Sequence, residues 1–111
     1  MIEKTVYDDL TDCLDVPVRM EVPENPPERF ALLEKTGSGV ENHIYSATIA
    51  VQSWAETLFE AAELNEQVKA AMDGIVRLPE VCRCQLNSDY NFTDTATKRY
   101  RYQAVFDLVH Y

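Results

Sequence analysis

The stretch KTGSGVENHIYSATIAVQSWAET, residues 35 to 57, decides the fold that we expect for this chain. It contains two of the chain's three glycines, then a run that alternates between apolar and polar residues, and then the only tryptophan. The alternation over residues 44 to 52 predicts a half-buried strand, and residues 29 to 36 predict another. Because Gly37 and Gly39 leave the backbone free to turn, we expect a hairpin with a flexible glycine loop between these strands.

A helix is expected to follow this hairpin without a pause. Ser53 precedes Glu56 by three residues, which is the spacing of a capping box, and apolar residues continue from Trp54 at helical spacing. We therefore predict a helix that begins at Trp54 and buries its indole ring. Asn65 would fall within the apolar stripe, so we also predict a break there, with Asn65 capping a second helix over residues 66 to 76.

The remaining segments complete an α+β domain that spans residues 1 to 111. Apolar residues at helical spacing predict a helix over residues 2 to 14, and alternation predicts strands over residues 16 to 22, 81 to 87 and 99 to 109. Pro17 cannot donate to a ladder and belongs at a strand start or on an edge. We expect a mixed or antiparallel sheet of about four to five strands with helices on one face, in the order helix, three strands, two helices, two strands.

Composition limits the classes of partner. The 111 residues suit one domain, and the formal net charge is -9 with a pI of about 4.5. An acidic surface repels both nucleic acid and anionic membranes. No apolar run approaches the length of a membrane span, and the first residues have neither the basic nor the apolar region of a secretory signal. We therefore expect no membrane partner.

The three cysteines, Cys13, Cys82 and Cys84, form no visible disulfide framework, which is typical of a reducing compartment. We expect them to be small buried hydrophobic residues. A zinc site would need two more ligands, and the sequence offers only His43 and His110. We therefore expect no metal and no cofactor.

No motif predicts catalysis, and we expect that the protein is not an enzyme. The glycine loop precedes a strand and lacks the Gly-Lys-Ser/Thr of a phosphate loop. The two histidines have no nearby serine, cysteine or carboxylate arrangement of a triad. The acidic residues of the first helix could attract a hard cation, but a solvated acidic face is the simpler interpretation; they are Asp8, Asp9, Asp12 and Asp15.

The segment KRYRY, Lys98 to Tyr102, is the only basic cluster interleaved with aromatic residues, a pattern that can bind single-stranded nucleic acid. Strand alternation separates Arg99 and Arg101 on one face from Tyr100 and Tyr102 on the core side. The expected helix carries an opposite, acidic strip. Opposite patches allow copies to associate head to tail. The strip consists of Glu56, Glu60, Glu63 and Glu66.

Several phrases occur in order along nearly the whole chain: VPVRMEVPENPPERFALLEKTG, EKTGSG, IAVQSWA, LFEAAELNEQVKAAMDGI, LNSDYNFTD and KRYRYQAVFDLVHY. Together they resemble the tail completion and tail terminator proteins, also described as minor tail or capsid proteins, of siphophages and Gram-positive prophages. The expected element order is similar to that of the lambda-like tail terminators. The resemblance implies a hexameric ring that caps the tail tube, ends its polymerisation and helps join tail to head.

This resemblance also implies the partners and the location of the protein. The partners are other copies of the chain, the major tail tube protein and the head connector or neck protein, and DNA only passes through the ring. The protein would lie in the host cytoplasm during assembly and then at the head-proximal end of the tail. A head-side neck or head–tail joining protein is the alternative, and a nucleic-acid-binding module is a more remote one. The expected assembly residues are Gly37, Ser38, Gly39, Glu41 and His43 in the loop, with Glu56, Glu60, Arg99 and Arg101 elsewhere.

Overall fold

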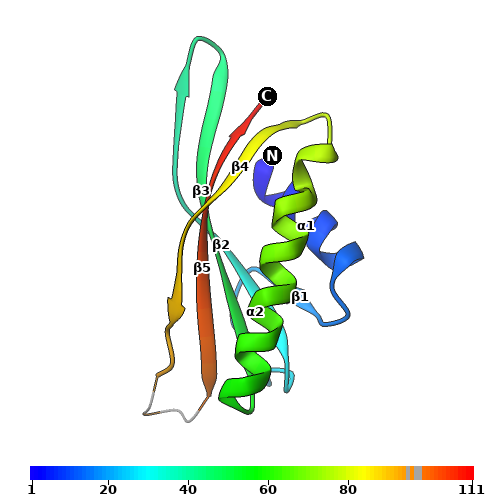
Figure 1. Ribbon diagram of the computed structural model, residues 1–111, viewed down its shortest axis with the longest axis vertical. Helices are drawn as coiled ribbons and strands as arrows, with labels where there is room; N and C mark the ends of the chain where they lie inside the picture. The colour runs from blue at the N-terminus through cyan, green and yellow to red at the C-terminus, as the bar shows by residue number, and fades with distance from the viewer. Residues whose placement is uncertain (95, 97–98) are drawn as a thin grey trace.

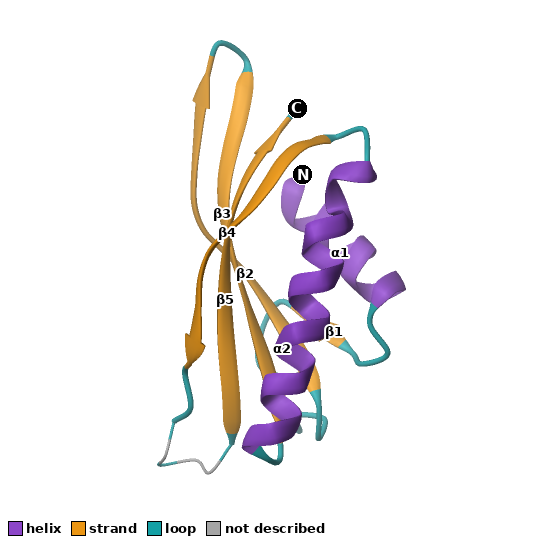
Figure 2. Ribbon diagram, in the orientation of Figure 1, coloured by secondary structure: helices purple, strands orange, loops and turns teal. Residues whose placement is uncertain are grey.

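The computed structural model describes residues 1–94, 96 and 99–111, and it has the expected α+β class (Figure 1). Two helices cover one face of a five-stranded sheet, as Figure 2 shows. The elements are α1 Ile2–Cys13, β1 Val18–Arg19, β2 Phe30–Glu41, β3 Ile44–Ala55, α2 Leu58–Asp73, the 3-10 helix η1 Gly74–Arg77, β4 Val81–Asn91 and β5 Tyr100–His110.

The strands lie in the order β1-β2-β3-β5-β4. β1 is parallel to β2, and every other neighbouring pair is antiparallel. The strand predicted over residues 16 to 22 is wrong in length, because only Val18 and Arg19 pair with β2. Pro17 lies at the start of this edge strand, as predicted, and its carbonyl accepts a hydrogen bond of 2.9 Å from the Ala31 N–H.

The main core fills the space between the sheet and the two helices. Alternate residues of the central strands point toward the helices, since successive side chains of a strand lie on opposite faces. Every one of the following side chains is buried: Val6 and Leu10 from α1, Leu64, Val68 and Met72 from α2, Ala31 and Leu33 from β2, Ile49 and Val51 from β3, and Phe106 and Leu108 from β5.

The helix predicted to begin at Trp54 begins four residues later. β3 continues to Ala55, and Thr57 is the N-cap, its hydroxyl accepting a hydrogen bond of 3.2 Å from the Glu60 N–H. Both Ser53-x-x-Glu and Thr57-x-x-Glu have the spacing of a capping box, so the local signal was ambiguous. Strand pairing decides which of the two residues caps the helix. Trp54 pairs with Phe30 of β2 and Arg101 of β5, so β3 continues past Ser53 and the helix begins after Thr57.

The break predicted at Asn65 is also wrong, since α2 runs through it without interruption. Asn65 is 2% exposed, and its Nδ2 donates a hydrogen bond of 3.0 Å to Asp89 Oδ2. Lys69 Nζ binds the same carboxylate oxygen at 2.7 Å. β4, which runs to Asn91 and not to residue 87, thus supplies the polar partner that allows an asparagine within the buried side of α2.

A second, smaller apolar cluster of Phe30, Leu32 and Trp54 lies on the opposite face of the sheet. The rings of Phe30 and Trp54 stack with centroids 5.2 Å apart. Trp54 is buried as predicted, at 7% exposure, and its Nε1 donates to Gln52 Oε1 at 3.0 Å. Trp54 is therefore buried as a residue of β3, by its packing with Phe30 on the face of the sheet opposite the helices.

Removal of the Trp54 ring is expected to be among the costliest single changes. Trp54→Ala should lower the free energy of unfolding by about 3–5 kcal/mol, because it removes a buried aromatic side chain and leaves a cavity. Denaturant unfolding followed by circular dichroism measures this difference. Phe59→Ala is the matched control, since Phe59 is 76% exposed and its removal should change stability by no more than about 0.5 kcal/mol. Equal losses for the two variants would contradict the assignment.

The Asp89 contact with α2 predicts a pH-dependent contribution to stability. The pKa of Asp89 lies below its ordinary value, mainly because Lys69 donates a hydrogen bond to the carboxylate and Asn65 adds another. A lowered folded-state pKa stabilises the fold above the pKa of an unfolded aspartate, about 4, and this stabilisation is lost as the pH falls through the folded pKa.

Asp89→Asn should therefore destabilise the protein at pH 7, by no more than about 1 kcal/mol because the pair is partly exposed. The difference from the unchanged protein should shrink toward zero at pH 3. Urea unfolding at both pH values measures it, with Asp12→Asn on the exposed side of α1 as the control. A difference that is the same at both pH values would show that the charge of Asp89 is not its cause.

Candidate functional site

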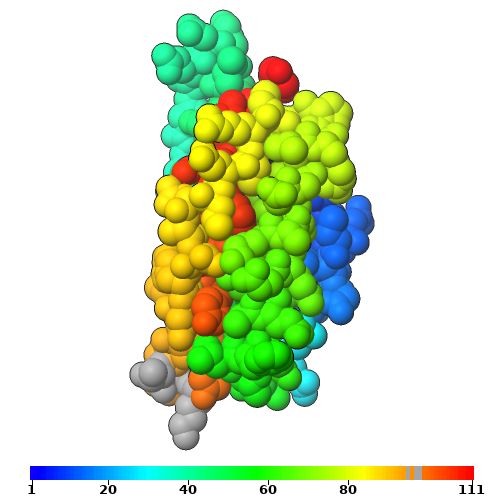
Figure 3. Space-filling model, in the orientation of Figure 1, coloured from blue at the N-terminus to red at the C-terminus, as the bar shows by residue number. Residues whose placement is uncertain are grey.

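The candidate site is the distal half of the β2–β3 hairpin, residues Glu34 to Ser46, which we call the arm. Every residue of the arm is exposed. Figure 3 shows the arm standing out at one end of the molecule, beyond the body formed by α2 and β4. The molecule measures 45 × 24 × 24 Å, so the arm lies at a pole of its long axis.

The arm differs from the glycine loop that the sequence predicted. Gly37, Ser38 and Gly39 lie within β2, which pairs with β3 as far as Glu41 opposite Ile44. The turn consists of Asn42 and His43, with φ values of 51° and 64°. Two consecutive positive φ angles are typical of a type I′ hairpin turn, and Asn and His adopt them more readily than most residues.

The loop prediction is wrong because the glycines are paired strand residues and not the turn. The Asn42–His43 pair was the available local signal for a two-residue turn. Neither Gly37 nor Gly39 has a positive φ. A Cβ at Gly37 would meet no atom within 4 Å, and one at Gly39 would lie 3.2 Å from Ser46 Oγ. The hairpin was predicted correctly, whereas its flexible loop is regular strand.

Apolar side chains gather on the arm and beside it. Val40 is 63% exposed, and Ile44 and Tyr45 are also exposed. The Tyr45 ring stacks on His110 at the end of β5, with centroids 5.6 Å apart. A hollow of about 490 Å³ lies between the arm and the first turn of α1, lined in part by Ile2, Val40 and Tyr45. This pole therefore offers an apolar surface that the described residues leave exposed.

The base of the arm is attached to α1 by an ion pair. Lys35 Nζ lies 3.3 Å from Glu3 Oε2. The pKa of Glu3 is below its ordinary value, first because a backbone hydrogen bond at Glu3 favours the charged form and then because Lys35 lies nearby. Beyond Lys35, the described arm is held by strand pairing, by the Tyr45–His110 stack and by the Thr36 hydroxyl, which donates to the Thr48 carbonyl at 3.4 Å.

The two predicted arginines lie at the opposite pole, in an arginine–aromatic cluster with Phe30, Trp54 and Phe92. The Arg101 guanidinium lies 4.8 Å from the centroids of both Trp54 and Phe92, and its Nε donates to the Phe92 carbonyl at 2.7 Å. Arg99 lies 5.7 Å from the Trp54 ring and donates to the Pro27 carbonyl at 2.8 Å. Cation–π contacts of this kind stabilise the side chains within their own chain.

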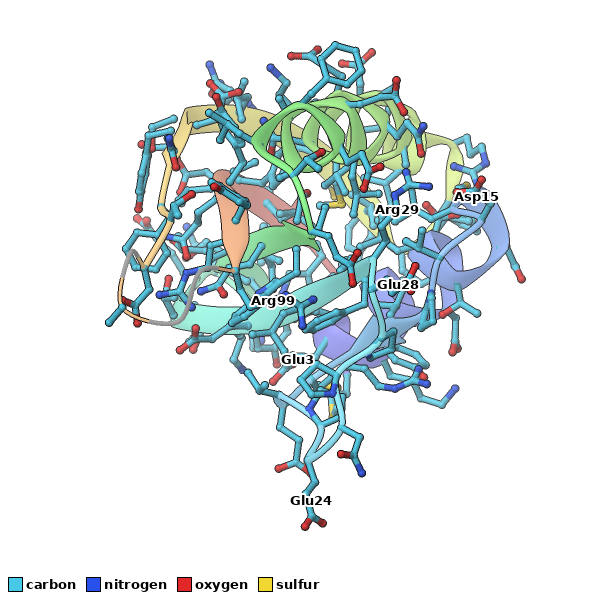
Figure 4. The ribbon with its side chains drawn as sticks, turned by 90° about the horizontal axis from the view of Figure 1, so that it is seen from below. Glu3, Asp15, Glu24, Glu28, Arg29 and Arg99 are labelled. Atoms are coloured by element: carbon cyan, nitrogen blue, oxygen red, sulfur yellow. The ribbon has the colours of Figure 1, made fainter. Side chains whose placement is uncertain are left out.

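Figure 4 views this pole from below, with Arg99 near the middle and Glu24 on a loop that points away from it. Arg99 also contacts the carbonyl of Glu28 at 3.3 Å, so it joins β5 to the loop before β2. The separation of the arginines from Tyr100 and Tyr102 follows the predicted alternation. Lys98 of the same basic segment lies outside the described residues. The arginines thus serve the fold, which does not favour the nucleic-acid alternative.

The predicted acidic residues also lie at this pole. Glu56 is exposed in the turn before α2, and Glu60 lies in the first turn of that helix, where a negative charge is favourable. The candidate assembly residues therefore form two groups at opposite ends of the molecule (Figure 1). Gly37, Ser38, Gly39, Glu41 and His43 belong to the arm, and Glu56, Glu60, Arg99 and Arg101 belong to the other pole.

Two predictions about reactive side chains need correction. Cys13 and Cys82 are exposed and are not core residues, whereas Cys84 is half-buried and packs against the main core. Burial raises the pKa of the Cys84 thiol to about 11. Asp9 is not part of a solvated acidic face, because it is buried and forms an ion pair with Arg77. The sequence pattern around Asp9 did not indicate its partner, because Arg77 of η1 lies far away in the chain.

No group of three metal-ligating side chains occurs within residues 1–94, 96 and 99–111. In the same part of the chain, no helix has the length and apolar character needed to cross a membrane. Compared with known proteins, the sequence matches no family model and no curated protein. Because the arm is exposed and carries exposed apolar side chains, it is the feature of the described structure that most requires a functional explanation.

The tight turn, and not the glycines, should determine whether the arm forms. His43→Val should lower the free energy of unfolding by about 1–2 kcal/mol, because a β-branched residue is strained at a φ of 64°. Gly37→Val and Gly39→Val should leave the chain folded, the second after a small shift of Ser46. Thermal unfolding compares the three variants, and unfolding caused by Gly37→Val would restore the glycine-loop interpretation.

Proposed function

We propose that this protein is a structural component of a tailed phage or prophage, a tail terminator or tail completion protein that caps the tail tube, ends its polymerisation and helps join tail to head. Support comes from the ordered phrases that resemble this family and from the α+β fold with helices on one face. The observation that carries the proposal is the arm, whose residues are all exposed and include the apolar side chains Val40, Ile44 and Tyr45.

Exposed apolar surface of this kind is typical of contact with another protein. Val40, Ile44 and Tyr45 provide it on the arm, and Leu58 and Phe59 are exposed at the first turn of α2, at the opposite pole. A protein that ends one assembly and joins it to another needs two such surfaces. Its partners are further copies of the chain, the major tail tube protein and the head connector or neck protein.

This function requires no chemistry at a bound substrate. We propose that the protein is not an enzyme and needs no cofactor, since several of the described titratable groups, such as Asp89 with Lys69 and Asp9 with Arg77, serve contacts within the fold. DNA would only pass through the ring. The protein would act in the host cytoplasm during assembly and remain at the head-proximal end of the tail. A head-side neck or joining protein is the alternative within the same structural class.

Electron microscopy of particles from a phage or prophage that lacks this gene tests the proposal. Deletion should give overlong tails without heads, because nothing stops polymerisation of the tube. Tails of normal length beside filled, unattached heads would instead assign the protein to the head-side joining role. Normal infectious virions would contradict both assignments. Complementation with Gly37→Val and Gly39→Val, which should fold, is expected to restore tail termination less well than the unchanged gene does.

A further inference from the structure

The sheet has two edges along which the described residues provide no strand partner. β1 covers the outer edge of β2 only at Ala31 and Leu32, so β2 is open from Leu33 to Glu41. β4 is the last strand at the other side, and its outer edge is open along its length. Open edges present rows of N–H and C=O groups that can pair with a strand of another chain.

The open edge of the arm contains one exposed stretch of regular pairing, and the open edge of β4 contains two stretches of regular pairing. The pairing of β2 with β3 shifts between Lys35 and Gly37, and from Gly37 to Glu41 it is regular. The pairing of β4 with β5 shifts between Val81 and Arg83 and again between Leu86 and Ser88. Four regular residues, 83 to 86, lie between these shifts, and residues 88 to 91 are regular beyond the second shift. Bulges bend a strand and interrupt its ladder, so an added strand fits best on a regular stretch. Of the two on β4, residues 83 to 86 carry the basic Arg83, whereas residues 88 to 91 carry Asp89, which is already bound by Lys69.

The strand directions suit a contact between copies in the same orientation. β2 is antiparallel to β3, β3 to β5, and β5 to β4, so β4 runs opposite to β2 within the sheet. When a second copy is placed beside the first, its β4 is therefore antiparallel to the first copy's β2. Such a contact uses different surfaces on the two partners, and it closes into a ring when the rotation allows.

Charge favours the same arrangement. Antiparallel pairing brings the end of β2, where Glu41 lies, beside the beginning of the regular part of β4, where Arg83 lies. Both residues are exposed, and Arg83 Nη2 forms a hydrogen bond of 2.7 Å with the neutral Gln85. In a chain with a net charge of -9, contacts between like surfaces are repulsive, so an Arg83–Glu41 approach selects the β4 edge as the partner of the arm.

We propose that the regular stretch of the arm, Gly37 to Glu41, pairs with residues 83 to 86 of β4 in a second copy of this chain and so continues the sheet from copy to copy. The inference rests on the proposed assembly function, and it names the partner surface of the arm. The partner surface also bears Leu86, whose side chain is 44% exposed beside an apolar hollow that Cys84 and Phe106 line.

The native cysteines of β4 allow a direct test by disulfide trapping. Cys84 lies within the proposed stretch of β4, and Cys82 lies just before it. Single cysteines are introduced at Ser38→Cys, Gly39→Cys and Val40→Cys in a Cys13→Ser background, and the full-length protein is mildly oxidised at high concentration. Directly opposed residues of antiparallel strands have Cα atoms about 4.5–5.5 Å apart, within the range that a disulfide bridges.

At least one arm cysteine should give a ladder of intermolecular disulfides on a non-reducing gel. The ladder should disappear when Cys82→Ser and Cys84→Ser are added. Phe59→Cys is the matched control, since it is exposed at the opposite pole and should give no ladder through β4. Glu41→Arg combined with an arm cysteine should reduce the ladder, and Arg83→Glu added to it should restore the ladder.

Two results would overturn the proposal. One is cross-linking no greater than that of Phe59→Cys at every arm position. The other is a dimer that persists without Cys82 and Cys84, because it would show that two arms contact each other. Either result together with overlong tails in the deletion strain would remove this contact and leave the proposed function. A β4-dependent ladder together with normal virions would support the contact and remove the function.

Discussion

The pairing of β2 with β3 is the constraint on which the rest of the structure depends. Its register is set at one end by the positive φ angles of Asn42 and His43 and at the other by the stacked rings of Phe30 and Trp54. A shift by one residue would transfer Ile49 and Val51 from the core face to the open face. Because β3 also pairs with β5, and β5 with β4, the same register places the rest of the sheet and the face that receives α1 and α2.

The two ends of this hairpin make different contacts, although the same two paired strands form both. Toward the body, Trp54 contacts the arginines of the arginine–aromatic cluster on the open face of the sheet. Arg101 of β5 lies over its ring, and Arg99 joins β5 to the loop before β2. Toward the tip, the described contacts of the two strands are their pairing with each other, the pairing of Tyr45 and Ser46 with β5, the stack of Tyr45 on His110 and the ion pair of Lys35 with Glu3. Side-chain contacts within the fold are therefore concentrated at one end and open strand edge at the other, which suits the assembly function proposed for this protein.

The candidate site could be predicted in part. The projecting hairpin and the alternation that separates Arg99 and Arg101 from the neighbouring tyrosines follow from period-two patterns, which depend only on neighbours in the sequence. The role of the two arginines could not be predicted, because their partners Trp54, Phe92 and Pro27 lie far away in the chain. The same reason explains Asp9, which the sequence predicted to be exposed. It is buried and forms an ion pair with Arg77 of η1, a residue distant in the sequence.

The sequence by itself determined the α+β class, the helix α1 and the presence of the four longer strands, since periodicity and hydrophobicity report which side of an element faces a core. It also predicted that Trp54 is buried, although on a helix and not on the strand where it lies. Only the tertiary structure decided between local signals of equal quality. Thr57 and not Ser53 caps α2, because Trp54 pairs across the sheet; Asn65 continues α2, because Asp89 of β4 meets its side chain; and the glycines extend β2, because β3 supplies a partner for each of them. Hydrogen bonds between distant segments outweigh propensity differences of at most about 1 kcal/mol per residue, and no local pattern contains them.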